Sequence, residues 1–361
     1  MKNLFFRVDA SKEIGTGHLI RCLTIAHKAK IHGFNIVFIC KNDKDNLKQM
    51  VVNEGFQFFE IPKELNFKID PTVNYSEWLK SSFEHDVSKS INIIQQFIGQ
   101  KYLIIDHYGI DFKWETIIYE FVDKLIVIDD LADRKHKCDI LIDQNFFMDL
   151  NVRYKDKLIG ETKTFLGPNF AIFRDEFYVN RILVNVRTKV QKILIFFGGS
   201  DPTNATLRTL NLINEINLEN IAVEVVVGST NKDKDEIQTI CNNTRNFNFH
   251  CQINYFSKLI SECDLCIGAG GINLWERIFM LLPTITISVA ENQDSVLQEV
   301  QKTGCIYHLG HHKNLSQNEI KKQLLRLIHN PSEIQKMSIN CKSVISSNDK
   351  DYLINDILSK Q

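Results

Sequence analysis

The sequence of 361 residues has little proline and glycine, no excess of either charge and no long apolar run. With 6 Pro and 16 Gly it cannot be a collagen-like or low-complexity chain. Lys and Arg number 43 against 44 Asp and Glu, giving a formal net charge of −1, and no block of like charge predicts a nucleic-acid groove. No stretch reaches the roughly 18 apolar residues that span a bilayer. We therefore expect neither a nucleic acid nor a membrane as partner.

The cysteines and the N-terminal residues give no sign of an exported protein. The 9 Cys are odd in number and scattered, which does not fit a disulfide framework. Met1–Asn3 leads through the short apolar run Leu4–Phe6 to Arg7, without the longer apolar segment of a secretory signal. We expect a cytoplasmic protein with reduced thiols.

Short apolar runs, each followed by a turn and a helical pattern, are the main feature of the chain. Hydrophobic residues make up 44% of it, as in an ordinary packed protein. The pattern predicts parallel strands in an α/β fold. The expected strands are residues 4–8, 35–40, 102–106, 124–128 and 140–142, then 192–197, 223–227, 247–252, 265–267, 284–287 and 306–307.

The two series of strands predict two Rossmann-like domains facing a cleft, which agrees with a length of roughly two domains of about 150 residues. The charged stretch Arg153–Thr188 separates the series, so we place the N-terminal domain at 1–188 and the C-terminal domain at 189–361. Residues 348–361 have the apolar pattern of a terminal helix. Residues 41–90 are longer than a usual connection and predict no particular structure.

Two glycines and a histidine stand where the first strand leads into a helix, in the stretch Gly15-Thr16-Gly17-His18. Ile20 occupies the third glycine position of a dinucleotide-binding motif, and no Walker loop occurs. The glycines instead let the backbone approach a ligand, and His18 lies on the first helical turn. The positive end of a helix disfavours an imidazolium, which suits a general base, although His18 could equally bond a loop carbonyl. Arg21 could pair with Asp9 or hold a polar ligand.

Two glycine-rich loops in the second half, Gly198–Asn204 and Gly268–Asn273, each follow a strand and open a helix. Such loops offer backbone N–H groups and helix ends to an anion, and together they could hold one diphosphate. Glycine-rich turns are also common in purely structural roles. Glu276, one turn into its helix, is placed to accept hydrogen bonds from ribose hydroxyls.

The clusters of cysteine and aspartate give weaker evidence of a functional site. Cys263 and Cys266 have the spacing of a zinc or redox pair, but no second pair accompanies them. Asp129 and Asp130 followed by Asp133 are better explained by a turn or a helix cap than by a divalent cation. We expect neither a metal nor a cofactor.

The order of these motifs resembles that of the UDP-2,4-diacetamido-2,4,6-trideoxy-β-L-altropyranose hydrolase family of pseudaminic acid (nonulosonic acid) biosynthesis. The resemblance covers residues 4 to about 310. It is carried by Arg7–Ser11, Ile14–Arg21, Ile105–Gly109, Ile128–Ala132, Asp143–Asn145, Leu166–Pro168, Arg174–Phe177, Phe197–Asp201, Gly268–Gly271, Trp275–Arg277 and Glu291–Gln293.

The resemblance implies a two-domain fold like that of GT-B glycosyltransferases and a metal-independent reaction that releases UDP and 2,4-diacetamido-2,4,6-trideoxy-L-altrose. His18 would be the base that activates water for inverting attack at the anomeric carbon. The expected substrate-binding residues are Asp9, Gly17, Arg21, Asp106, Tyr108, Arg174 and Asn292. The expected UDP-binding residues are Gly199, Ser200, Asn204, Gly270, Gly271, Asn273 and Glu276.

Two other functions remain open on the sequence. A GT-B-type glycosyltransferase would use the same UDP loops and a base, and a UDP-sugar-binding protein would lack catalysis. The small-molecule partner in every case is a UDP-amino sugar, and we expect a monomer.

Overall fold

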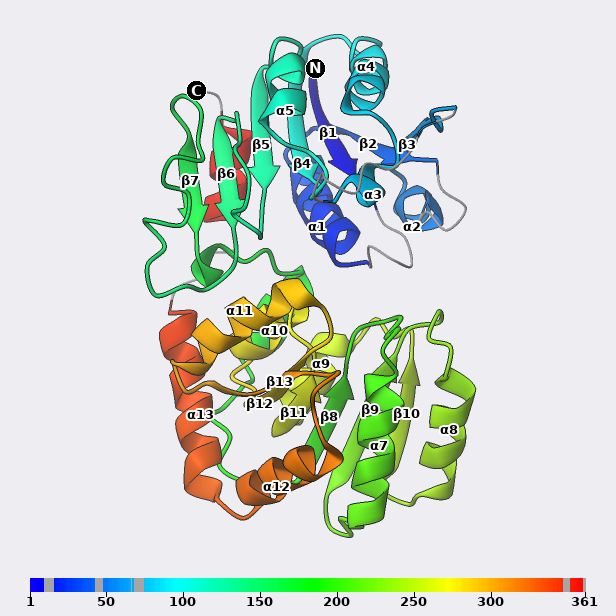
Figure 1. Ribbon diagram of the computed structural model, residues 1–361, viewed down its shortest axis with the longest axis vertical. Helices are drawn as coiled ribbons and strands as arrows, with labels where there is room; N and C mark the ends of the chain where they lie inside the picture. Colours follow the sequence, from blue (N-terminus) through cyan, green and yellow to red (C-terminus); the bar gives the residue numbers. More distant parts are fainter. Residues whose placement is uncertain (10–15, 43–47, 66, 68–74, 347–350, 360–361) are drawn as a thin grey trace. The chain divides into compact units, whose positions relative to one another are not determined.

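The computed structural model describes residues 1–9, 16–42, 48–65, 67, 75–346 and 351–359, and these form two compact units, each built on a parallel β-sheet (Figure 1). Unit 1 consists of Met1–Asn145, Asp149–Ile172 and the C-terminal helix, and unit 2 of Phe146–Met148 and Phe173–Asn348. Two Rossmann-like α/β sheets are what the apolar runs predict, and this prediction is confirmed.

Unit 1 contains a seven-stranded sheet with the order β3-β2-β1-β4-β5-β6-β7. Its strands are β1 (Lys2–Val8), β2 (Asn35–Lys41), β3 (Gln57–Ile61), β4 (Gln100–Asp106), β5 (Lys124–Ile128), β6 (Ile140–Asp143) and β7 (Lys163–Leu166). Its helices are α1 (Gly17–Ile31), α2 (Lys48–Asn53), α3 (Ser76–Leu79), α4 (Phe83–Ile94), α5 (Phe112–Tyr119), the 3₁₀ turn η1 (Pro168–Phe170) and α14 (Tyr352–Leu358).

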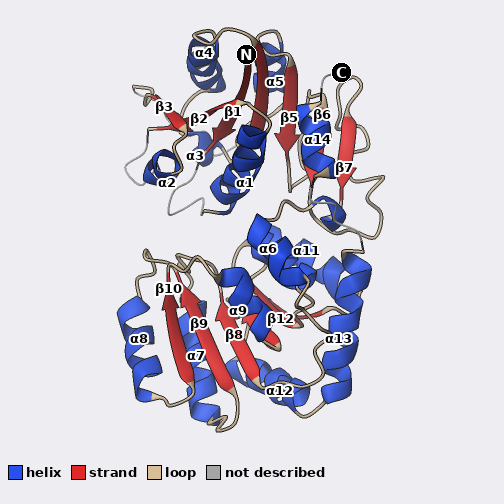
Figure 2. Ribbon diagram, turned by 180° about the vertical axis from the view of Figure 1, so that it is seen from behind, coloured by secondary structure: helices blue, strands red, loops and turns tan. Residues whose placement is uncertain are grey.

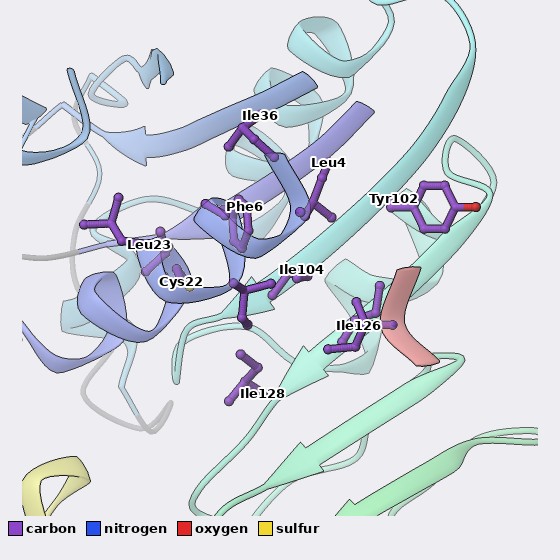
Figure 3. Packing of buried hydrophobic residues seen from close by; sticks show 14 of the residues in the cluster. Leu4, Phe6, Cys22, Leu23, Ile36, Tyr102, Ile104, Ile126 and Ile128 are labelled. Carbon is purple, nitrogen blue, oxygen red and sulfur yellow. The ribbon is translucent and has the colours of Figure 1, made fainter. Parts of the chain in front are cut away.

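Both faces of this sheet are buried. Leu4 and Phe6 of β1 pack in a cluster with α1 and α14, whereas Phe5 packs in the opposite cluster with α4 and α5. Figure 3 shows the first cluster, in which Cys22 and Leu23 of α1 lie beside side chains of the strands, and Figure 2 shows α1 and α14 on the same side of the sheet. Strands covered on both faces read as continuous apolar runs, which is why they could be predicted.

Unit 2 contains a six-stranded sheet with the order β10-β9-β8-β11-β12-β13. Its strands are β8 (Lys192–Phe196), β9 (Ala222–Val227), β10 (Phe247–Cys251), β11 (Leu265–Gly268), β12 (Thr284–Ser288) and β13 (Ile306–His311). Its helices are α6 (Asp175–Arg181), α7 (Ala205–Ile216), α8 (Lys234–Asn243), α9 (Phe256–Glu262), α10 (Ile272–Phe279), α11 (Glu291–Gln301), α12 (Gln317–Ile328) and α13 (Pro331–Val344).

The division between the units differs from the expected boundary. It falls between Ile172 and Phe173 rather than near residue 188, and the C-terminal helix α14 is grouped with unit 1 rather than with the second domain. Leu353 and Ile357 of α14 are buried in the same cluster as α1, and Lys124 Nζ donates to carbonyls near the end of α14 at 3.0 Å. The physical reason is burial, because the apolar side of this helix covers a sheet face that lies far from it in sequence. Among the described residues, none of the helices has both the length and the apolar character needed to cross a bilayer.

Candidate functional site

The charged residues of unit 1 gather where its central strands end. Parallel pairing of β1 with β4 sets Val8 opposite Asp106, and Asp9 follows β1 directly. Asp129 and Asp130 follow β5, which neighbours β4. The carboxyl ends of parallel strands meet at one edge of a sheet, which is where ligands of α/β proteins bind.

His18 lies in the first turn of α1, one residue after Gly17 opens the helix, and contacts Asp106. Its Nδ1 lies 2.6 Å from Asp106 Oδ1, and both side chains are largely buried. An ionised carboxylate can only accept hydrogen bonds, so Nδ1 is the nitrogen that donates to Asp106, and Nε2 is the acceptor nitrogen of the neutral ring. The arrangement holds an imidazole with its basic nitrogen directed away from the carboxylate. Gly15, part of the predicted glycine loop, lies outside the described residues.

Arg21 joins two carboxylates behind His18. Its Nε and Nη2 donate to the two oxygens of Asp106 at 2.5 and 2.6 Å, and its Nη1 donates to Asp130 Oδ2 at 2.7 Å. Burial raises the pKa of Asp106, but the charge of Arg21 and the hydrogen bonds from Arg21 and His18 outweigh it and hold that pKa well below its usual range. Arg21 Nη2 also lies 3.3 Å from His18 Nδ1, a longer approach than the 2.6 Å contact with the carboxylate. Asp106 and Arg21 are thus occupied with each other and with His18, which favours a positioning role over the expected direct contact with substrate.

Aromatic rings surround His18. The Tyr108 ring lies 4.8 Å from the imidazole at 84°, and its hydroxyl donates to Asp130 Oδ2 at 3.1 Å. Trp78 of α3 lies 5.8 Å from the imidazole at 90°. Trp78 was not found from the sequence, because it falls in the stretch 41–90 for which no pattern predicted a structure.

Asp9 is buried among protein groups. It accepts two hydrogen bonds from Arg7 at 2.8 and 3.0 Å and one from the Lys41 backbone N–H at 2.6 Å, and His107 Nε2 lies 3.0 Å away. Arg7 also binds Asp86 on α4. Both carboxylate oxygens of Asp9 are engaged, so its surroundings favour tying β1 to its neighbours over the expected contact with substrate.

A second buried charge cluster lies beside β5. His136 Nδ1 is 2.7 Å from Glu115 Oε1, and its Nε2 is 3.6 Å from Asp129 Oδ2. Burial alone would lower the pKa of His136, but Glu115 and Asp129 raise it to about 9. This histidine is therefore charged at neutral pH and serves as the cation between two acids.

The first glycine-rich loop of unit 2 ends in a capped helix. Asp201 is 2% exposed and accepts hydrogen bonds from the backbone N–H groups of Ala205 and Thr206 at 3.2 and 2.7 Å. An aspartate at this position satisfies donors that an anion would otherwise bind. The helix end behind Gly199, Ser200 and Asn204 is thus occupied by the protein itself, which differs from the expected anion cradle.

The second glycine-rich loop ends in an uncapped helix. No side chain among the described residues caps α10, and its N-cap residue Gly271 has φ 83° and ψ −164°, a conformation reserved for glycine. A Cβ on Gly268 would clash with the Phe196 carbonyl and with the buried Arg277, whose Nη2 donates to the carbonyl of Ala269. Gly270 packs closely on α11. The loop is therefore rigidly built and leaves its helix end open.

The remaining predicted residues of unit 2 lie close to this loop. Asn273 Nδ2 donates to Glu276 Oε2 at 2.7 Å, and Arg174 Nη2 lies 3.5 Å from Glu276 Oε1. Burial raises the pKa of Glu276 even though Arg174 opposes the shift. Asn292 is exposed in the first turn of α11, the helix that packs on Gly270. Within the described ranges, no group of three or more His, Cys, Asp or Glu side chains could hold a metal ion.

Comparison with known proteins supports a glycosyltransferase-like architecture. Residues 193–352 match the glycosyltransferase family 28 C-terminal domain. The fold is similar to that of the spinosyn rhamnosyltransferase SpnG complexed with thymidine diphosphate, with a TM-score of 0.66, 11% identity and coverage of 99% of this chain and 100% of that one. This confirms the expected GT-B-like fold.

Two curated relatives are distant. The chain is 28% identical over 310 residues to an uncharacterized protein of Methanocaldococcus jannaschii, covering 82% of this chain but only 58% of that protein. It is 25% identical over 304 residues to the UDP-2,4-diacetamido-2,4,6-trideoxy-beta-L-altropyranose hydrolase of Campylobacter jejuni, covering 83% of this chain and 97% of that protein. The resemblance inferred from the motifs therefore extends along most of a hydrolase, at low identity.

Proposed function

We propose that the protein hydrolyses UDP-2,4-diacetamido-2,4,6-trideoxy-β-L-altropyranose to UDP and 2,4-diacetamido-2,4,6-trideoxy-L-altrose. The observation that carries the proposal is the His18–Asp106–Arg21 arrangement, in which Nδ1 of His18 is held by Asp106 and Nε2 is directed away from the carboxylate. The hydrolase name of the Campylobacter relative supports the choice of substrate.

In the proposed reaction, His18 Nε2 removes a proton from water while the water oxygen attacks the anomeric carbon. The bond from that carbon to the diphosphate oxygen breaks, and UDP leaves with the electron pair, so the configuration inverts. Asp106 stabilises the imidazolium that forms, as a buried carboxylate does for a catalytic histidine. UDP is already a good leaving group, so positioning and charge stabilisation suffice.

We assign recognition of the nucleotide to unit 2. The open N-terminus of α10 behind Gly270 and Gly271 would receive the diphosphate on backbone N–H groups. Glu276 would accept hydrogen bonds from the ribose hydroxyls, with Asn273 orienting it. Gly199 and Ser200 would contact the nucleotide from the loop itself, because Asp201 occupies the N-terminal end of the helix that follows.

The test follows UDP release by NMR from the purified protein and the UDP-sugar, with and without a chelator. His18→Asn should lower turnover about a hundred- to ten-thousand-fold, the usual effect of losing a general base, and leave UDP affinity unchanged. His27→Asn, which removes a half-exposed histidine of the same helix, is the matched control and should retain activity. Wild-type turnover in His18→Asn would remove His18 from the mechanism.

The family 28 domain match favours a second candidate, a glycosyltransferase that uses a UDP-amino sugar. A transferase requires an acceptor, whereas the proposed hydrolase releases free sugar without one. UDP release that appears only after an acceptor sugar is added would support the transferase.

A further inference from the structure

Trp78 stands beside the proposed base on a one-turn helix that the sequence did not predict. Its ring stacks on Tyr108 at 4.9 Å and 23°, and it meets His18 edge to face at 5.8 Å. Tyr75 lies 5.7 Å from Trp78 and 5.5 Å from Tyr108. Trp78 is partly exposed, and no hydrogen bond joins its Nε1 to any residue that the structure describes.

The backbone holds this ring in place at both ends of α3. Tyr75 and Lys80 have φ of 57° and 51°, values that cost a non-glycine residue free energy and persist where surrounding contacts enforce them. A Cβ on Gly109, the residue after Tyr108, would come within 2.9 Å of the Tyr75 carbonyl, so the glycine permits the close approach of α3. Leu79 is buried in the core beneath. The indole is therefore fixed against the site rather than attached to a loose surface loop.

We propose that Trp78 is a specificity-determining residue that contacts the sugar beside His18 and selects an N-acylated deoxyhexose. This inference rests on the proposed function. An indole ring favours the C–H groups and methyl of a deoxy sugar over hydroxyls, which would lose water hydrogen bonds against it. Its free N–H can donate to an acyl carbonyl oxygen. Together these two properties match a sugar that has lost hydroxyls and gained acetamido groups.

Kinetics with two substrates test the selectivity. Trp78→Ala should raise KM for the UDP-diacetamido-trideoxy sugar about tenfold, the scale of one lost apolar contact, and reduce the preference for it over UDP-N-acetylglucosamine. Trp78→Phe keeps a ring but no N–H and should fall between wild type and Trp78→Ala. UDP affinity, measured by calorimetry, should stay unchanged in both variants. A fall in kcat with unchanged KM and preference would mean that Trp78 only supports the His18 ring, and would overturn the proposal.

Fluorescence tests contact with the sugar without relying on turnover. The other two tryptophans, Trp114 and Trp275, are 0% and 2% exposed, so acrylamide quenching reports mainly on Trp78. The free product sugar should protect wild type from quenching, and Trp78→Phe should lose both the quenching and the protection. If the sugar protects Trp78 from quenching but the protein does not hydrolyse the UDP-sugar, the proposed function is refuted and the sugar contact stands. If the protein hydrolyses the UDP-sugar but the sugar gives no protection and the Trp78 variants have unchanged kinetics, the sugar contact alone is refuted.

Discussion

The two units differ in how they present polar groups. Unit 1 gathers paired side chains at the ends of its strands, where Arg21 binds both Asp106 and Asp130 and also lies next to His18. Unit 2 uses backbone instead, in the glycine-rich turn that opens α10. A paired cluster can hold a proton acceptor in one orientation, and a turn of backbone N–H groups can receive an anion without a cluster of lysines. The difference supports the proposal that the chemistry takes place in unit 1 and that unit 2 recognises the nucleotide.

The two glycine-rich loops of unit 2 differ in whether a side chain occupies the N-terminus of the helix that follows. Asp201 fills the helix end after the first loop, whereas the part of the chain that the structure describes offers no side-chain cap to the helix after the second. Loops of similar composition therefore need not bind the same ligand.

The largest expected effect comes from Asp106→Asn. An amide can donate to His18 Nδ1, which would move the imidazole proton to Nε2 and remove the base. We expect kcat to fall about a hundred- to ten-thousand-fold with UDP affinity unchanged. Asp149→Asn, at an exposed site of unit 1, is the matched control. If Asp106→Asn kept wild-type kcat while folded, the assignment of chemistry to unit 1 would fail.

The charge cluster of His136 should make stability depend on pH. Its pKa of about 9 lies above that of an unfolded histidine, so its contribution is complete below about pH 6.5 and is lost as pH rises through 9. This upward shift in the pKa of His136 corresponds to a contribution of about 3 kcal/mol to the free energy of unfolding at low pH. Urea unfolding from pH 6 to 10 should show this decline in the wild type, while His136→Gln should be less stable at pH 6 and depend less on pH. Equal pH slopes in the two proteins would contradict the ion cluster.

A smaller effect is expected in unit 2 from Glu276→Ala. Loss of a carboxylate acceptor for ribose should weaken UDP binding about tenfold. Binding of 2′-deoxy-UDP, which lacks one of the hydroxyls, should weaken less. Calorimetry with both nucleotides measures the difference, and an equal loss for the two would place Glu276 away from the 2′-hydroxyl.

The smallest effect should follow from Asp201→Ala. Removing a helix cap costs about 1 kcal/mol of stability, measured by thermal unfolding. UDP affinity should change less than twofold, because that helix end has no place in the proposed diphosphate site. A marked gain in UDP affinity would show that the diphosphate reaches α7 and would remove the contrast between the two loops.

Strands were predictable here, whereas partners of side chains were not. The buried strands of both sheets are apolar runs that a local pattern reveals, but the edge strand β3 has only Ile61 fully buried and gave no such signal. The bond between His18 and Asp106 joins residues 88 positions apart and depends on the pairing of β1 with β4. Trp78 could not be found, because contacts with Tyr108 and Gly109 rather than local periodicity set the position of α3. The Asp201 cap had a local signal, an aspartate just before a helix, which also suits a glycine-rich anion loop.

The reaction in ¹⁸O-labelled water, without any acceptor, tests the central claim most directly. Attack of His18-activated water on the anomeric carbon predicts ¹⁸O in the released sugar, none in UDP, and a first-formed product of inverted anomeric configuration. Label in the phosphate of UDP, or no release of UDP until an acceptor is added, would contradict hydrolysis at the sugar carbon.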